Sequence, residues 1–165
     1  MKSFLSRFAH KLDNNYGGRY FAAILREICI EDSSLIRILF PGISNTYWKD
    51  IRENNFEIIV EYTFHSFAVI ASNRRADLAL CIDDKPIALL EVKDDDDKLP
   101  KNFAQISDYI CFCNKHREIH FTYLTKHIPP KRDIALIKSN DNRYRHLLFA
   151  EGAFPIWGHF FQNKY

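Results

Sequence analysis

The sequence predicts an α/β fold in which a mixed central β-sheet is flanked by helices within a single domain. Two apolar runs, 74–80 and 87–93, are joined by the turn residues Asp-Asp-Lys-Pro at 83–86, which is typical of a β-hairpin. A helical pattern at 101–113 links this hairpin to a strand-like run at 119–125, which favours parallel pairing of the linked strands. Of the 165 residues, 47% are hydrophobic and 15% are aromatic. This composition is enough for one sizeable core and excludes a disordered chain.

The other elements follow from hydrophobic periodicity. A spacing of three to four between apolar residues predicts helices, and β-branched or aromatic runs predict strands. In chain order, the remaining predictions are a helix at 3–12, a second helix with Phe21, Ile24, Leu25 and Ile28 on one side, strands at 56–63 and 66–72, short strand or helix pieces at 134–137 and 144–149, and an aromatic cap at 154–161.

Charged residues end the second arm of the hairpin. Because side chains alternate along a strand, Ile87, Leu89, Glu91 and Lys93 are expected on one face. A charge at the end of a buried strand is costly unless it is paired or binds a cation, and Glu91 and Lys93 facing Asp77 on the neighbouring arm would satisfy this need. The alternative is an ordinary solvated strand end before an acidic loop.

Asp77, the Glu91-Val92-Lys93 segment, and Gln105 with Tyr109 in the following helix resemble the motifs of the PD-(D/E)XK nuclease superfamily, which has a restriction-endonuclease-like fold. The Gln-x-x-x-Tyr spacing is similar to the branch related to the RecB nuclease domain. The resemblance covers a core of about 20–125 within a single domain, 1–165, and leaves 126–165 as a C-terminal extension. Ala76 stands where the superfamily's name motif has proline.

The resemblance implies a metal site and roles for the residues around it. Asp77, Glu91 and the Val92 carbonyl would bind one or two Mg²⁺ ions, for which Mn²⁺ can substitute, because hard oxygen ligands suit these ions. Lys93 would orient or deprotonate the attacking water. Gln105 would hold a water or the catalytic groups, and Tyr109 would contact substrate phosphate.

Two further acids are candidates to supplement this site. The superfamily often takes an acid from the helix before the sheet, which points to Glu27, and several relatives have a glutamate on the strand that here carries Glu61. Glu27 can equally be an exposed helix residue beside Arg26, and Glu61 a carboxylate at the sheet edge.

Charge placement indicates a nucleic-acid partner more clearly than the net charge of +2 does. Between 115 and 146, eight Lys or Arg stand against three acids. The run 94–97 consists of four aspartates, and we interpret it as a solvated loop before a helix rather than as an ion-binding segment. The residues expected to contact nucleic acid, DNA rather than RNA, are Arg74, Arg75, Lys98, Lys101, Lys131 and Arg132.

The four cysteines, Cys29, Cys81, Cys111 and Cys113, lie in apolar runs without Cys-x-x-Cys spacing, which favours buried reduced thiols. No iron–sulfur cluster is predicted. The N-terminus lacks the apolar core of a signal peptide and no stretch has the length of a membrane span, so a cytoplasmic protein with no membrane partner is expected. A homodimer would let two sites cut two strands.

The sequence therefore predicts a metal-dependent nuclease that hydrolyses phosphodiester bonds, with endonuclease action on DNA as the leading hypothesis. The alternative from another class is a catalytically silent nuclease-fold module that binds nucleic acid or a protein partner. In a third interpretation, the chain is a small-molecule enzyme or a structural α/β domain in which the Asp77, Glu91 and Lys93 triad is coincidental.

Overall fold

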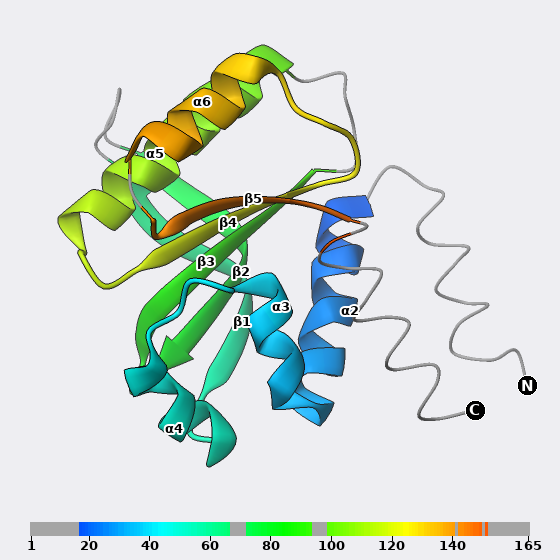
Figure 1. The fold of residues 1–165 in the computed structure, drawn as a ribbon, viewed down its shortest axis with the longest axis vertical. Helices are drawn as coiled ribbons and strands as arrows, with labels where there is room; N and C mark the ends of the chain where they lie inside the picture. The colour runs from blue at the N-terminus through cyan, green and yellow to red at the C-terminus, as the bar shows by residue number, and fades with distance from the viewer. Residues whose placement is uncertain (1–16, 67–71, 94–98, 141, 150, 152–165) are drawn as a thin grey trace, which may run out of the picture.

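The computed structural model describes residues 17–66, 72–93, 99–140, 142–149 and 151 (Figure 1). In chain order, its elements are α2 (Gly17–Glu31), η1 (Ser33–Leu35), α3 (Ile36–Leu39), η2 (Asn45–Tyr47), α4 (Trp48–Arg52), β1 (Glu57–Ser66), β2 (Ser72–Ile82), β3 (Lys85–Lys93), α5 (Leu99–Lys115), β4 (His120–Thr125), α6 (Lys131–Asn140) and β5 (Tyr144–Leu148). The helix predicted at 3–12 and the aromatic cap at 154–161 lie outside the described residues.

The strands form one five-stranded sheet in the order β1-β2-β3-β4-β5. β1 pairs with β2 and β2 with β3 in antiparallel fashion, whereas β3–β4 and β4–β5 are parallel. α5 links the first parallel pair and α6 the second. The predicted α/β fold with a mixed sheet flanked by helices is therefore confirmed, and it is the arrangement expected of a restriction-endonuclease-like core.

The predicted hairpin is formed by β2 and β3, and its turn is tighter than expected. Asp83 and Asp84 have φ angles of 49° and 60°. A two-residue hairpin loop of the I′ kind requires positive φ at both central positions, and aspartate tolerates this conformation better than most residues. β3 therefore begins at Lys85 rather than after Pro86.

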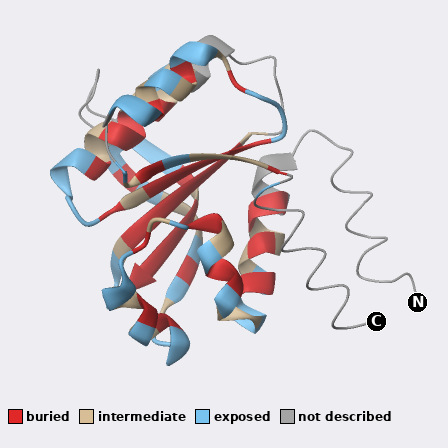
Figure 2. Ribbon diagram, in the orientation of Figure 1, coloured by how far each residue is buried: buried red, intermediate tan, exposed pale blue. Residues whose placement is uncertain are grey.

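Two hydrophobic clusters cover the two faces of the sheet. The first packs α2, α3 and α4 against the sheet, and the second packs α5 and α6 against the other face (Figure 1). β3 contributes to both, since Leu90 belongs to the first cluster and Leu89 to the second. Figure 2 shows the central strands as the most continuously buried part of the chain, as expected for strands covered on both faces.

β1 and β2 change faces part of the way along their length. Val60 belongs to the first cluster, yet Phe64, an even number of residues further on, belongs to the second. The same change separates Leu78 from Ala76 on the paired strand. Glu61 lies between Val60 and Phe64 on β1, and its φ of 55° is outside the strand region. This conformation reverses the face of the sheet to which the following side chains point.

Several predicted boundaries differ from the structure. The strand predicted at 56–63 continues to Ser66, and Ser72 begins β2, whereas 67–71 of the strand predicted at 66–72 lie outside the described residues. The pieces at 134–137 and 144–149 correspond to α6 and β5, so the sheet continues into the segment interpreted as a C-terminal extension. Within the described residues, the helices are too short or too polar to cross a bilayer.

Candidate active site

Glu91 is the most unusual residue of the central strand, because it is a carboxylate with a relative exposure of only 3%. It follows Leu90 on β3 and points to the α5 side of the sheet, where its oxygens meet side chains of that helix. An ionised carboxylate at such a position is costly unless donors surround it.

Three donors satisfy the Glu91 carboxylate. Gln105 donates through Nε2 to Oε1 at 2.5 Å, and the Lys93 ammonium lies 2.5 Å from the same oxygen. The hydroxyl of Tyr109 donates to Oε2. These contacts follow from two periodicities: residues two apart share a face of β3, and residues four apart share a face of α5.

Asp77 lies on the neighbouring strand and is held by β3. Its Oδ2 accepts a hydrogen bond from the main-chain N–H of Val92 at 2.7 Å. This contact lies just beyond the Leu78–Leu90 pair, which ends the β2–β3 ladder on the side away from the turn. Burial, and then the charges of Glu91 and Asp77, raise the pKa of the Tyr109 hydroxyl well above its usual value. The structure thus brings together Asp77, Glu91, Lys93, Gln105 and Tyr109.

The donor set suits a divalent cation that prefers oxygen. Among the described residues, no cluster of three or more His, Cys, Asp or Glu side chains is spaced to hold a metal ion. Mg²⁺ is commonly bound by one or two carboxylates while it keeps several waters, so Asp77 and Glu91 with a main-chain oxygen are chemically sufficient. Lys93, whose side chain is 25% exposed, now neutralises the carboxylate that such an ion would contact.

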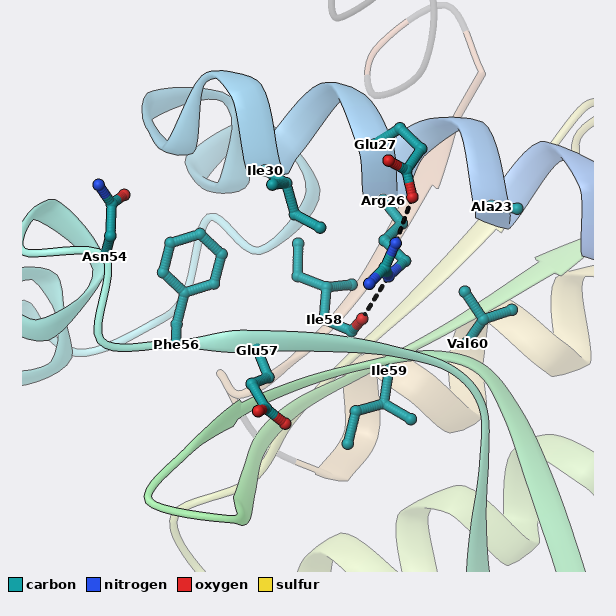
Figure 3. A pocket seen from close by; sticks show the side chains of 10 residues that line it. All are labelled: Ala23, Arg26, Glu27, Ile30, Asn54, Phe56, Glu57, Ile58, Ile59 and Val60. Carbon is teal, nitrogen blue, oxygen red and sulfur yellow. Dashed lines mark hydrogen bonds and ion pairs between the residues drawn. The ribbon is translucent and has the colours of Figure 1, made fainter.

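The two supplementary acids lie in different places. Glu27 is on α2, on the opposite face of the sheet from α5, where its carboxylate pairs with Arg26 and lines an open groove of about 800 Å³ beside β1 (Figure 3). Glu61 lies on β1 between Val60 and Tyr62, whose partners Leu78 and Ala76 flank Asp77 on β2. Its Oε1 is 3.3 Å from Nη1 of Arg75. Glu61 is therefore the nearer of the two to the central carboxylates.

Arg74 is anchored by a residue whose role the sequence did not reveal. Its Nη2 lies 2.6 Å from Oδ2 of Asp108, a residue of α5 that is 2% exposed. The sequence feature that could have indicated this role is the position of Asp108, an acid directly before Tyr109 in the apolar part of the helix. This ion pair ties β2 to α5 beside the donors of Glu91 and leaves Arg74 44% exposed.

The remaining basic candidates are distributed along α5 and α6. The guanidinium of Arg132 lies 4.9 Å from the centre of the Phe103 ring, with Nε 3.2 Å from Oδ1 of Asp133. Asp133 is fully buried, and this burial raises its pKa. Lys131 is exposed at the start of α6. Lys101 belongs to α5 but its side chain, like all of Lys98, lies outside the described part of the structure.

A five-stranded mixed sheet with helices on both faces is consistent with a restriction-endonuclease-like fold. The family model of the type I restriction enzyme R protein N terminus matches residues 37–147, more than half of the chain, and the chain belongs to this family. The matched segment includes Asp77, Glu91 and Tyr109 but not Glu27. Comparisons with curated proteins and with solved structures gave no match.

Proposed function

We propose that this chain is a divalent-metal-dependent nuclease that hydrolyses phosphodiester bonds, with DNA as its substrate. The observation that carries the proposal is the buried Glu91 carboxylate, which Lys93, Gln105 and Tyr109 hold beside Asp77. Membership of a family named for a restriction enzyme subunit supports nuclease-related chemistry. A purely structural strand has no need of this many polar groups at one point of its core.

Asp77 and Glu91, with the Val92 carbonyl, would hold Mg²⁺ or Mn²⁺. Such an ion would lower the pKa of a coordinated water and offset negative charge on the phosphate. Lys93 keeps its ammonium at the partly exposed edge of this cluster, where it can donate a hydrogen bond that orients the attacking water and can stabilise developing negative charge.

Gln105 and Tyr109 act through Glu91 in this proposal. Tyr109 has no exposed surface, and its hydroxyl reaches Glu91 and lies 3.1 Å from the Arg75 carbonyl oxygen. A phenol with one proton and no exposure is placed to orient a carboxylate rather than to contact a phosphate. We therefore regard Tyr109 and Gln105 as positioning residues.

The exposed arginines supply candidate phosphate contacts around this centre. Arg74 and Arg132 are each held by a buried aspartate, which fixes the guanidinium before a ligand arrives. A guanidinium held in place loses less side-chain entropy when it pairs with a phosphate. Arg75, Lys131, Lys98 and Lys101 remain further candidates in the proposal.

The decisive experiment measures cleavage and binding by the same variants. Supercoiled plasmid and linear duplex are incubated with the chain in Mg²⁺ or Mn²⁺, and gel shifts are recorded in Ca²⁺. We expect Asp77→Asn and Lys93→Met to lower the cleavage rate by about 100-fold or more while the gel shift remains. Lys138→Met, an exposed lysine on α6, serves as the matched control and should cleave as the wild type does. Mg²⁺-dependent cleavage retained by Lys93→Met would contradict the proposed role.

The second candidate is a catalytically silent module that binds nucleic acid or a protein. It is favoured by one observation: Lys93, Gln105 and Tyr109 already satisfy both oxygens of Glu91 without a cation. Calorimetric titration with Mn²⁺ separates the two functions. A nuclease site should release heat on binding that Asp77→Asn abolishes, whereas a silent module should show none.

A further inference from the structure

A second groove lies on the α5 side of the sheet, and its lining includes none of the Glu91 donors. It has a volume of about 660 Å³ and is enclosed by the second half of β1, by the β2–β3 turn and by the residues after α5. We call it the aromatic groove, and the residues that give it its character are Tyr62, Phe64, Lys85, Phe112, His116 and Arg117. Its volume falls in the range of small-ligand sites.

The floor of the aromatic groove is a set of aromatic side chains. Tyr62 and Phe112 are half-buried, and the Phe112 ring lies 4.7 Å, centre to centre, from the buried Phe64 and 4.7 Å from the exposed His116. Phe64 in turn lies 5.0 Å, centre to centre, from Tyr109, which holds Glu91. The groove therefore shares its packing with the candidate active site, although its opening is separate.

The rim of the groove is basic. Lys85 and Arg117 are exposed on it, and His65 and His116 lie beside them. The lining also includes the carboxylate of Glu118, which accepts a hydrogen bond from the Tyr47 hydroxyl at 2.9 Å. Half-buried rings under a positively charged rim form a surface that complements a base and its phosphate.

We infer that the aromatic groove binds a single-stranded segment of nucleic acid. Unpaired bases stack on Tyr62 and on the packed rings of Phe112 and His116, and backbone phosphates pair with Lys85 and Arg117. Stacking on a protein ring requires a base whose face is free, which a duplex interior does not offer. The choice of nucleic acid as ligand rests on the proposed function, and the groove deepens it by giving a place for a frayed or displaced strand.

The test measures binding of a fluorescein-labelled dT12 to the full chain by anisotropy, in EDTA and over a series of KCl concentrations. We expect Phe112→Leu, which keeps an apolar side chain, to weaken binding about tenfold by loss of stacking. Lys85→Gln with Arg117→Gln should reduce the slope of log affinity against log salt by about 0.7 for each lost phosphate contact. Lys138→Gln, a matched exposed lysine on α6, should leave both quantities unchanged.

The inference is overturned if dT12 fails to bind, or if binding by the double variant keeps the wild-type affinity and salt slope. The double variant decides the matter where Phe112→Leu proves misfolded by circular dichroism, because both of its changes are at exposed positions. Cleavage assays on the same preparations keep the two proposals distinct. If cleavage depends on Lys93 but the groove variants bind dT12 as the wild type does, only the present inference is wrong. If the groove variants weaken dT12 binding but the chain cleaves no substrate, only the proposed nuclease function is wrong.

Discussion

Glu91 shows how a single buried charge can organise the packing around it. Glu91 is only 3% exposed, and its carboxylate accepts hydrogen bonds from Gln105 and Tyr109 on α5. It also forms an ion pair with Lys93 on its own strand. Removing one partner from a buried charge typically costs several kcal/mol, because the remaining charge stays in the core without compensation. The donors are therefore part of the stability of the fold as well as of the proposed chemistry.

The first prediction concerns the hydroxyl of Tyr109. Its raised pKa keeps the phenol protonated, and hence a donor to Glu91, throughout the physiological range. Tyr109→Phe preserves the ring that stacks on Phe121 but deletes this donor. Since a hydrogen bond to a charged group contributes about 1.5–3 kcal/mol, we expect the free energy of unfolding, measured in urea, to fall by this amount.

Tyr47→Phe is the matched control for this prediction. The Tyr47 hydroxyl also donates to a glutamate, Glu118, but at an exposed position. Loss of an exposed hydrogen bond is compensated by water, so the free energy of unfolding should change by less than about 1 kcal/mol. Equal losses in the two variants would show that the Tyr109 hydroxyl does not stabilise a buried charge.

Much of this residue-level arrangement can be predicted from the sequence, because it depends on local periodicity. Alternation along a strand places Glu91 and Lys93 together, and helical spacing places Gln105 near Tyr109. The Arg74–Asp108 ion pair could not be predicted in this way. It depends on how far β2 twists across α5, which no spacing in the chain records.

At the scale of elements, the conformation of Glu61 determines how β1 is used. Its positive φ lets the strand pack Val60 under α2 and then Tyr62 against the α5 side. Positive φ costs a residue with a Cβ about 1–2 kcal/mol, and the surrounding pairing with β2 maintains it here. The pairs on either side of Glu61 flank Asp77 on β2, so this strained position lies near the candidate metal site.

The second prediction tests that strain. Glu61→Gly should keep nearly the wild-type free energy of unfolding, because glycine adopts positive φ without steric cost. Glu61→Val should lose about 2 kcal/mol relative to Glu61→Gly, since a β-branched side chain is strongly disfavoured there. Urea unfolding of both proteins gives the comparison, and both variants equally remove the Arg75 ion pair. If Glu61→Val were as stable as Glu61→Gly, the backbone at this position would not be strained.

The hairpin shows where strand periodicity fails at the element scale. Leu89 faces the α5 side with Glu91, as alternation predicts, but Ile87 belongs to the first cluster on the other face. The register between β2 and β3 shifts between Leu80 and Cys81, which breaks the alternation for the residues nearer the turn. A bulge of this kind leaves no clear signal in hydrophobic alternation.

At the scale of the whole molecule, the sequence predicts a mixed sheet correctly but places the end of the core near residue 125, before the last strand, β5. The pattern of strand, helix and strand around 101–113 gave the parallel pair β3–β4. β5 carries few buried positions, with Tyr144 buried and most of the strand only partly covered. Short runs of this kind do not distinguish strand from helix by periodicity, so the last strand was not assigned.

The last prediction is that the two hydrophobic clusters unfold together. Cys29 is buried in the first cluster and Cys113 in the second, and burial raises the pKa of each thiol to about 12. Both should resist N-ethylmaleimide at pH 8 in the native state, whereas the partly exposed Cys111 should react and serve as an internal control.

Peptide mapping after short pulses of N-ethylmaleimide at increasing urea concentration then reports the opening of each cluster. Adjacent residues of β3, Leu89 and Leu90, belong to different clusters, so neither cluster can lose its strand while the other keeps it. We therefore expect Cys29 and Cys113 to become reactive with the same urea midpoint and the same slope. Labelling of Cys113 well below the midpoint for Cys29 would mean that α5, with Gln105 and Tyr109, separates from an intact sheet, and that the candidate site can open without global unfolding.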